Sequence, residues 1–167
     1  WATKLTYINL YHIWYIPKNL TYMQQLTSLS INTSQLTEIP IQLTSLPNLK
    51  LLTLNRNQIK EIPEHIKSLK QLTSLNLSDN QIKEIPTEIT ELNQLTSLNL
   101  SKNPLPNIPW QITSIPNLTK LALNRNKLKE IPAHLKNLRK LKFLRLIHNQ
   151  LAVFPSFTGE LKELCSL

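Results

Sequence analysis

Glycine is almost absent from this chain. The sequence contains a single glycine, Gly159, although it has eleven prolines among its 167 residues. An average protein contains about 7% glycine, so this chain makes its turns almost without the residue that adopts left-handed backbone conformations most easily. Phosphate-binding loops need glycines where the backbone approaches the ligand closely. The near absence of glycine therefore excludes a glycine-rich nucleotide-binding loop.

Cysteine and long apolar runs are scarce as well. Cys165 is the only cysteine, so it has no partner for an internal disulfide. This favours a cytoplasmic protein, or one exported from a bacterium into a host cell, over a disulfide-capped extracellular domain. No stretch approaches the ~18 consecutive apolar residues of a transmembrane helix, so we expect no membrane span. The chain begins at Trp1 and ends inside a repeat, and we interpret it as part of a longer protein.

A leucine-based repeat runs through the whole chain. One leucine recurs every 23 residues, at Leu26, Leu49, Leu72, Leu95, Leu118, Leu141 and Leu164. A shorter unit of 21 residues starts at residue 5. We therefore predict one domain over residues 1–167, with seven units starting at residues 5, 26, 49, 72, 95, 118 and 141, and a partial unit from residue 164.

Each unit begins with the pattern of a short, half-buried strand. In the fourth unit, Leu72, Leu75 and Leu77 end in strict alternation with polar residues, which is typical of a strand with one buried face. An asparagine follows, and its amide can satisfy backbone groups of the turn that leaves the strand. In register, these amides should form a ladder inside the stack, which should end where Ser34 replaces asparagine. The ladder residues are Asn57, Asn80, Asn103, Asn126 and Asn149.

The second part of each unit predicts a return path. In the fourth unit it carries Ile82, Ile85, Ile89 and Leu92 at spacings of mostly three to four residues, with Pro86 at a position that is proline in every unit. This spacing favours an irregular, 3₁₀ or short helical segment, and proline presets φ there. No unit can bury its apolar stripe alone, so stability must come from stacking. Strands about 4.8 Å apart would make a stack roughly 30–35 Å long.

The pattern L-x-x-L-x-L-x-x-N-x-L-x-x-I-P-x-x-I-x-x-L-x-x resembles the typical 23-residue class of the leucine-rich-repeat superfamily. It is similar to the Ras-suppressor and LAP groups and to bacterial proteins built from the same unit, and the composition, rich in Lys, Asn and Ile, favours a bacterial member. The resemblance implies an α/β solenoid. This is a right-handed horseshoe with a concave parallel β-sheet, a 3₁₀, irregular or short-helical convex side, and a protein ligand on the concave face.

The positions that the repeat leaves free on the sheet provide the candidate binding residues. Near the C-terminal end an aromatic and an aliphatic residue are surrounded by basic residues, which is the composition expected at the centre of a protein interface. The alternative is that these apolar groups are covered by a missing cap. The candidate protein-binding residues are Lys120, Arg125, Phe143, Arg145, Ile147, His148 and the single apolar residue Leu51.

For the aromatic residues at two other places we predict structural roles in preference to ligand binding. The shortened first unit contains a cluster of aromatic residues and a histidine, and terminal units of solenoids are commonly atypical because they seal the core. We therefore expect capping here in preference to binding. The cluster comprises Tyr7, Tyr11, His12, Trp14 and Tyr15. On the return side, we expect Trp110 to pack on neighbouring coils.

The repeat register argues against catalysis. His12 and His148 occupy one column six units apart, roughly 29 Å at sheet spacing, and His65 and His134 lie three units apart, roughly 14 Å. No two histidines can share a metal at those distances, and no histidine lies beside a nucleophile. We expect no enzyme activity, no cofactor, no metal and no small-molecule substrate.

The basic charge is concentrated in the last repeats. Residues 1–117 hold nine basic and seven acidic residues, a net of +2, whereas residues 118–167 hold ten and three, a net of +7. An acidic protein partner explains this charge. Nucleic-acid binding is a weaker interpretation, because the basic residues lie on all sides of the predicted coil and few aromatic residues could stack on bases. We predict a protein-interaction module, with a targeting or scaffold segment of a larger bacterial effector or signalling enzyme as the alternative.

Overall fold

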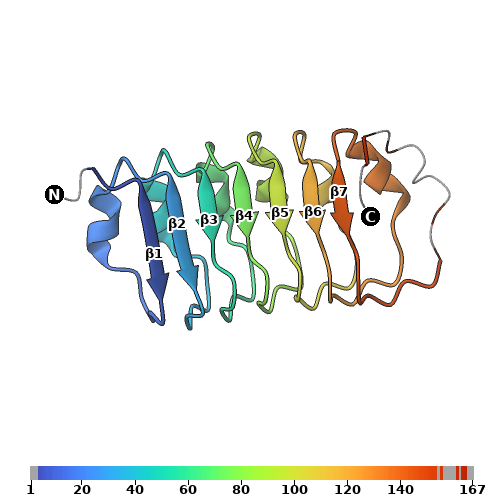
Figure 1. Ribbon diagram of the computed structural model, residues 1–167, viewed down its shortest axis with the longest axis horizontal. Helices are drawn as coiled ribbons and strands as arrows, with labels where there is room; N and C mark the ends of the chain where they lie inside the picture. Colours follow the sequence, from blue (N-terminus) through green and yellow to red (C-terminus); the bar gives the residue numbers. More distant parts are fainter. Residues whose placement is uncertain (1–3, 154, 156–160, 162, 165–167) are drawn as a thin grey trace.

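A parallel sheet of seven strands forms one side of the molecule (Figure 1). The computed structural model describes residues 4–153, 155, 161, 163 and 164; the predictions for Trp1, Gly159 and Cys165, and most of the partial unit from residue 164, lie outside these residues. The strands follow one another in sequence order. They are β1 (Tyr7–Tyr11), β2 (Ser28–Asn32), β3 (Leu51–Thr53), β4 (Ser74–Asn76), β5 (Ser97–Asn99), β6 (Lys120–Ala122) and β7 (Phe143–Arg145).

Short helices form the other side of the coil, behind the sheet in Figure 1. Each begins directly after a proline that has φ between −59° and −75°, the value that the pyrrolidine ring fixes. All but one are 3₁₀ helices. They are η2 (Lys18–Tyr22), η3 (Ile41–Ser45), η4 (Glu64–Ser68), η5 (Thr87–Glu91), α1 (Trp110–Thr113) and η6 (Ala133–Asn137).

The core lies between the sheet and the helices. Leu75 of β4 and the flanking Leu72 and Leu77 have no exposed surface, and neither do Ile82 and Ile89 of the return path. Equivalent leucines and isoleucines of the other coils form one continuous buried cluster with them. The repeat therefore folds as predicted, into a solenoid with a concave parallel sheet and a convex side of mostly 3₁₀ helices.

The turn that leaves each strand has a left-handed residue, although glycine is missing there. Seven non-glycine residues have φ between 49° and 60°, one in every coil. This conformation costs L-residues about 1–2 kcal/mol, and it is least suited to the β-branched Thr33. The stacked turns hold these residues in place. They are His12, Thr33, Arg56, Asp79, Lys102, Arg125 and His148.

Asparagine side chains link the coils inside this turn. The Asn80 amide oxygen accepts a hydrogen bond from the backbone N–H of Ile59 in the preceding coil at 3.0 Å. Its Nδ2 donates to the carbonyl oxygens of Leu54 and Leu77 at 2.9 and 3.0 Å. The same three bonds recur at Asn57, Asn103, Asn126 and Asn149. These amides satisfy backbone groups that would otherwise be buried without partners.

The hydrogen-bond ladder continues one step beyond the asparagines. We expected it to end where Ser34 stands in place of asparagine. Instead the Ser34 hydroxyl oxygen accepts a bond from the Ile13 backbone N–H at 3.1 Å and donates to the carbonyl oxygen of Asn32. A hydroxyl is too short to reach the two carbonyls that an amide reaches, so the first two coils keep only one of the two inter-coil bonds that an asparagine makes.

Candidate functional site

The register of the sheet fixes which side chains share the concave face. Ser97, Lys120 and Phe143 are direct neighbours on β5, β6 and β7, and so are Asn99, Ala122 and Arg145. Between these two rows the side chains of Leu98, Leu121 and Leu144 point into the core and are buried. Alternation along each strand therefore leaves two rows of free side chains on the face opposite the core.

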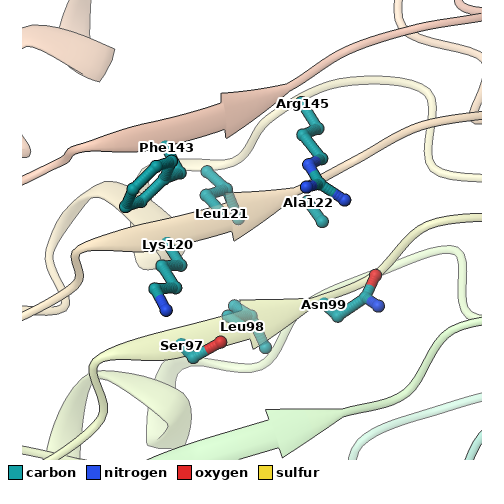
Figure 2. Close-up of a pocket in the computed structure, with 8 residues that line it drawn as sticks. All are labelled: Ser97, Leu98, Asn99, Lys120, Leu121, Ala122, Phe143 and Arg145. Atoms are coloured by element: carbon teal, nitrogen blue, oxygen red, sulfur yellow. The ribbon is translucent and has the colours of Figure 1, made fainter. Parts of the chain in front are cut away.

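A shallow hollow of about 310 Å³ lies over β5, β6 and β7 (Figure 2). It exists because Ala122, the smallest residue of its row, stands between the longer Asn99 and Arg145. In Figure 2, Arg145 extends from β7 over Ala122, while the Phe143 ring leans toward Lys120. The lining residues are Ser97, Leu98, Asn99, Lys120, Leu121, Ala122, Phe143 and Arg145.

The hollow combines an aromatic wall with two cations. The Lys120 Nζ lies 5.5 Å from the centroid of the Phe143 ring, within the range of a cation–π interaction. Phe143 keeps 39% of its surface exposed. No acidic residue lines the hollow, and the ion pairs found among the described residues include neither Lys120 nor Arg145. Both cations are therefore available to a ligand.

A second, polar hollow of about 320 Å³ adjoins the first and shares Asn99, Ala122 and Arg145 with it. At its far end the Asp79 carboxylate lies 3.8 Å from Arg56 Nε and 3.4 Å from Lys102 Nζ. Asp79 thereby neutralises these two cations in part, although all three side chains remain substantially exposed. The two hollows form a trough that is basic at Arg145 and partly neutralised at Asp79.

The structure brings together only some of the predicted binding residues. Lys120, Phe143 and Arg145 line one hollow, as described above. Ile147 is 60% exposed and belongs to the turn after β7, where its carbonyl oxygen accepts a bond from the Arg125 N–H at 2.8 Å. His148 follows in the same turn. Leu51 is exposed on β3, four strands from β7, so it does not belong to this patch.

Sequence reasoning did not single out Ser97, Asn99 and Ala122. Each occupies a free strand position, but none carries the charge or apolar surface that normally identifies an interface residue. The available signal was the contrast of size at Ala122, since its neighbours in the row, Asn99 and Arg145, are both larger. A gap of this kind is recognised only when adjacent coils are compared position by position.

The aromatic cluster of the first coil does not seal the core, contrary to our expectation. Trp14 and Tyr15 are 76% and 75% exposed, and Tyr7 and Tyr11 are more than half exposed. Partly buried aliphatic residues pack against the core at this end instead, namely Ile8, Leu10, Ile13 and Met23. The reason is position: the aromatic residues occupy places that point outward in every coil.

Trp110 is also more exposed than we expected. It begins α1 on the convex side and keeps 51% of its surface exposed. Its backbone carbonyl oxygen accepts bonds from the hydroxyls of Thr113 and Ser114. Packing on neighbouring coils therefore covers only about half of this side chain.

The part of the chain that the structure describes contains no cluster of three or more histidine, cysteine, aspartate or glutamate residues that could hold a metal ion. The longest helices found among the described residues contain five residues, and none has the length and apolar character that a membrane-crossing helix needs.

Comparison with known proteins identifies the class. A model of the leucine-rich repeat region matches residues 41–122. A leucine-rich-repeat protein of Leptospira interrogans superimposes with a TM-score of 0.86 and is 31% identical over 96% of this chain. An internalin of Listeria monocytogenes superimposes with a TM-score of 0.77 at 30% identity over 90% of this chain. The chain belongs to the leucine-rich-repeat superfamily.

A third similar structure is a plant peptide hormone receptor in complex with RGF2, with a TM-score of 0.78 and 28% identity over 97% of this chain. The chain spans 40% of the Leptospira protein, 43% of the internalin and 28% of the plant receptor. No curated protein matches the chain by sequence. Proteins of this superfamily are commonly non-enzymatic modules that bind other proteins.

Proposed function

We propose that this chain is a protein-interaction module and that its ligand docks on the C-terminal half of the concave sheet, over β5–β7. The observation that carries the proposal is the hollow that Phe143 lines together with Lys120 and Arg145. The peptide hormone receptor among the similar structures, which was solved with a bound partner, supports a binding role by analogy.

The physical reason is the composition of this surface. Interfaces are enriched in aromatic residues and arginine at their centres, and a few such residues carry most of the binding energy. Phe143 supplies exposed apolar area, and Arg145 can hold a carboxylate with two parallel hydrogen bonds. Because no acidic residue lines the hollow, the partner surface should be acidic, which would also speed association.

Alanine substitution at Phe143 and Arg145 tests the proposal. A partner would first be isolated on the immobilised wild-type chain, identified, and purified for calorimetric titration. Phe143→Ala and Arg145→Ala should each weaken binding about 30-fold, which corresponds to the ~2 kcal/mol of an interface hot spot. Leu51→Ala is the matched control, because Leu51 occupies the same column as Phe143 on β3. Unchanged affinity in both test variants would place the site elsewhere.

Nucleic-acid binding gives a different signature in the same titration. Lys127, Lys129 and Lys136 are exposed but lie outside the concave strands, so they could contact a polyanion on another side of the coil. Binding through phosphate contacts falls steeply as salt increases. Tight binding to a DNA or RNA oligonucleotide with such a slope, unaffected by Phe143→Ala, would favour this second function over the first.

A further inference from the structure

The hollow over Ala122 can receive an uncharged group, which an interaction between opposite charges alone would not need. We propose that it seats one apolar side chain of the partner, and that a carboxylate adjacent to that side chain in the partner pairs with Lys120 or Arg145. This inference rests on the proposed function, because it names the residues by which an acidic protein would occupy the same site. It predicts a short recognition element, an aliphatic or aromatic residue next to aspartate or glutamate.

The size of the hollow favours a single side chain. Its volume of about 310 Å³ is at the lower end of the roughly 300–1,000 Å³ found for pockets that enclose a whole small molecule. It is also open, since it lies on the exposed face of a three-residue strand. A side chain entering from a partner surface needs no enclosure, because the partner itself covers the opening.

The base of the hollow is apolar. Ala122 contributes only a methyl group, and the buried Leu98 and Leu121 lie beside it in the strands. The Phe143 ring closes one side, and Figure 2 shows it on the same side of the hollow as Lys120. An apolar group seated here would remove the ring and the methyl group from water, which is the main source of affinity in an interface.

The two cations then require an anion close to the apolar group. An uncharged partner would cover Lys120 and Arg145 and leave them partly desolvated without a counter-charge, which is unfavourable. Figure 2 shows these two side chains on opposite sides of the hollow, Lys120 near Ser97 and Arg145 over Ala122. A carboxylate adjacent to the apolar side chain can therefore reach a cation on either side.

The neighbouring polar hollow limits where the carboxylate can lie. Asp79 already contacts Arg56 and Lys102 at the far end of the trough. A second carboxylate placed there would have to share these two cations with Asp79, whereas no acidic residue lines the hollow at Lys120 and Arg145. The acidic residue of the partner is therefore expected at Lys120 or Arg145, and a polar uncharged residue is expected next to Asp79.

Filling the hollow without changing any charge is the sharpest test. Ala122→Leu occupies the space with a larger side chain, and Ala122→Asn does so with the residue that the same row has at Asn76 and Asn99, so the strand accommodates it. Thr53→Leu is the matched control, because Thr53 occupies the same row on β3, away from the hollow. Thermal unfolding of each variant verifies the fold.

The probe is an acetylated and amidated synthetic peptide, Gly-Leu-Glu-Glu-Gly, titrated into the isotopically labelled chain and followed by NMR. We expect shifts centred on Ser97, Lys120, Ala122, Phe143 and Arg145. Replacing the peptide leucine by serine, or both glutamates by glutamine, should weaken binding about tenfold. Ala122→Leu and Ala122→Asn should weaken it by about the same factor, and Thr53→Leu should have no effect.

Two results would overturn the inference. One is that the peptide causes no shifts around Ala122 at millimolar concentrations. The other is that it binds equally well when the hollow is filled.

The proposed function is tested separately, with the natural partner. If Phe143→Ala and Arg145→Ala weaken partner binding while both Ala122 variants bind the partner normally, the patch is the binding site but the hollow does not seat a partner side chain. If none of the four variants changes partner binding, both proposals fail.

Discussion

The middle coils and the first two coils use different contacts to hold the same stack. In the middle, each asparagine makes three buried hydrogen bonds to backbone groups of two coils, as at Asn80, and neighbouring strands pair over three residues. At the N-terminal end Ser34 makes one inter-coil bond. There β1 and β2 pair over five residues, from Tyr7 opposite Ser28 to Tyr11 opposite Asn32.

This comparison shows how side chains and backbone together link the coils. In the middle, backbone hydrogen bonds continue past the three-residue strands, as from the Arg56 N–H to the Ser78 carbonyl oxygen at 3.0 Å, and the amides add further links beside them. The first two coils have no asparagine at this position, and one hydroxyl bond together with strand pairing over five residues links them instead. Buried backbone groups need a partner in either case, and the sequence of each coil decides which kind of partner they receive.

The largest effect is expected at the centre of the amide ladder. Asn80→Ala should lower the free energy of unfolding by about 3 kcal/mol, because it leaves the buried Ile59 N–H without its partner. It also removes one of the two amide donors from each of the Leu54 and Leu77 carbonyl oxygens, which keep only their bonds to the neighbouring ladder asparagines. Urea unfolding measures the change. Asn76→Ala is the control: the Asn76 side chain lies on the free face of β4, and its amide oxygen accepts one part-buried bond, from the Ser78 N–H. The loss should therefore stay below about 1 kcal/mol.

The corresponding change at the N-terminal end should be smaller. Ser34→Ala removes one part-buried acceptor from the Ile13 N–H, and we expect a loss of about 1 kcal/mol in the same urea experiment. A loss as large as that of Asn80→Ala would mean that the longer β1–β2 pairing does not replace the missing amide bonds, and it would invalidate the comparison above.

One substitution in the first turns should stabilise the protein. Thr33 is β-branched and has φ of 49°, so Thr33→Gly should relieve backbone strain and raise the free energy of unfolding by about 1 kcal/mol. Thr53→Gly, in strand β3, should instead destabilise by about 0.5–1 kcal/mol, since there glycine adds only unfolded-state entropy. Equal losses in the two variants would show that the turn is not strained.

The smallest effect concerns an exposed contact between middle coils. Lys70 donates a 2.8 Å hydrogen bond to Glu91, and this bond holds the pKa of Glu91 below its ordinary value. Lys70→Met should raise that pKa, which NMR titration of the carboxyl group measures. A lowered folded-state pKa contributes stability above the unfolded-state pKa and loses it as pH falls through the folded-state value. Both side chains are about half exposed, so thermal stability should hardly change.

Much of the fold could be predicted from the sequence because each coil repeats the same physical problem. The spacing of Leu72, Leu75 and Leu77 distinguishes the buried face of a strand from its free face, and the 23-residue period brings equivalent residues of successive coils into register. The same logic correctly placed Lys120 beside Phe143 on neighbouring strands. The register also places Trp14 and Tyr15 at the outward positions that Lys83 and Glu84 occupy in the fourth unit. They were misinterpreted because their aromatic character received more weight than their register.

The sequence by itself determined the solenoid, its core and the columns of free residues, because these depend only on spacing along the chain. Only the tertiary structure decided which free residues form a site. The hollow over Ala122 depends on the lengths and directions of side chains from three strands, and the partial neutralisation at Asp79 depends on distances to Arg56 and Lys102 in adjacent coils. The left-handed turns that replace glycine likewise became apparent only in the stacked backbone, because the neighbouring coils hold each strained residue in place.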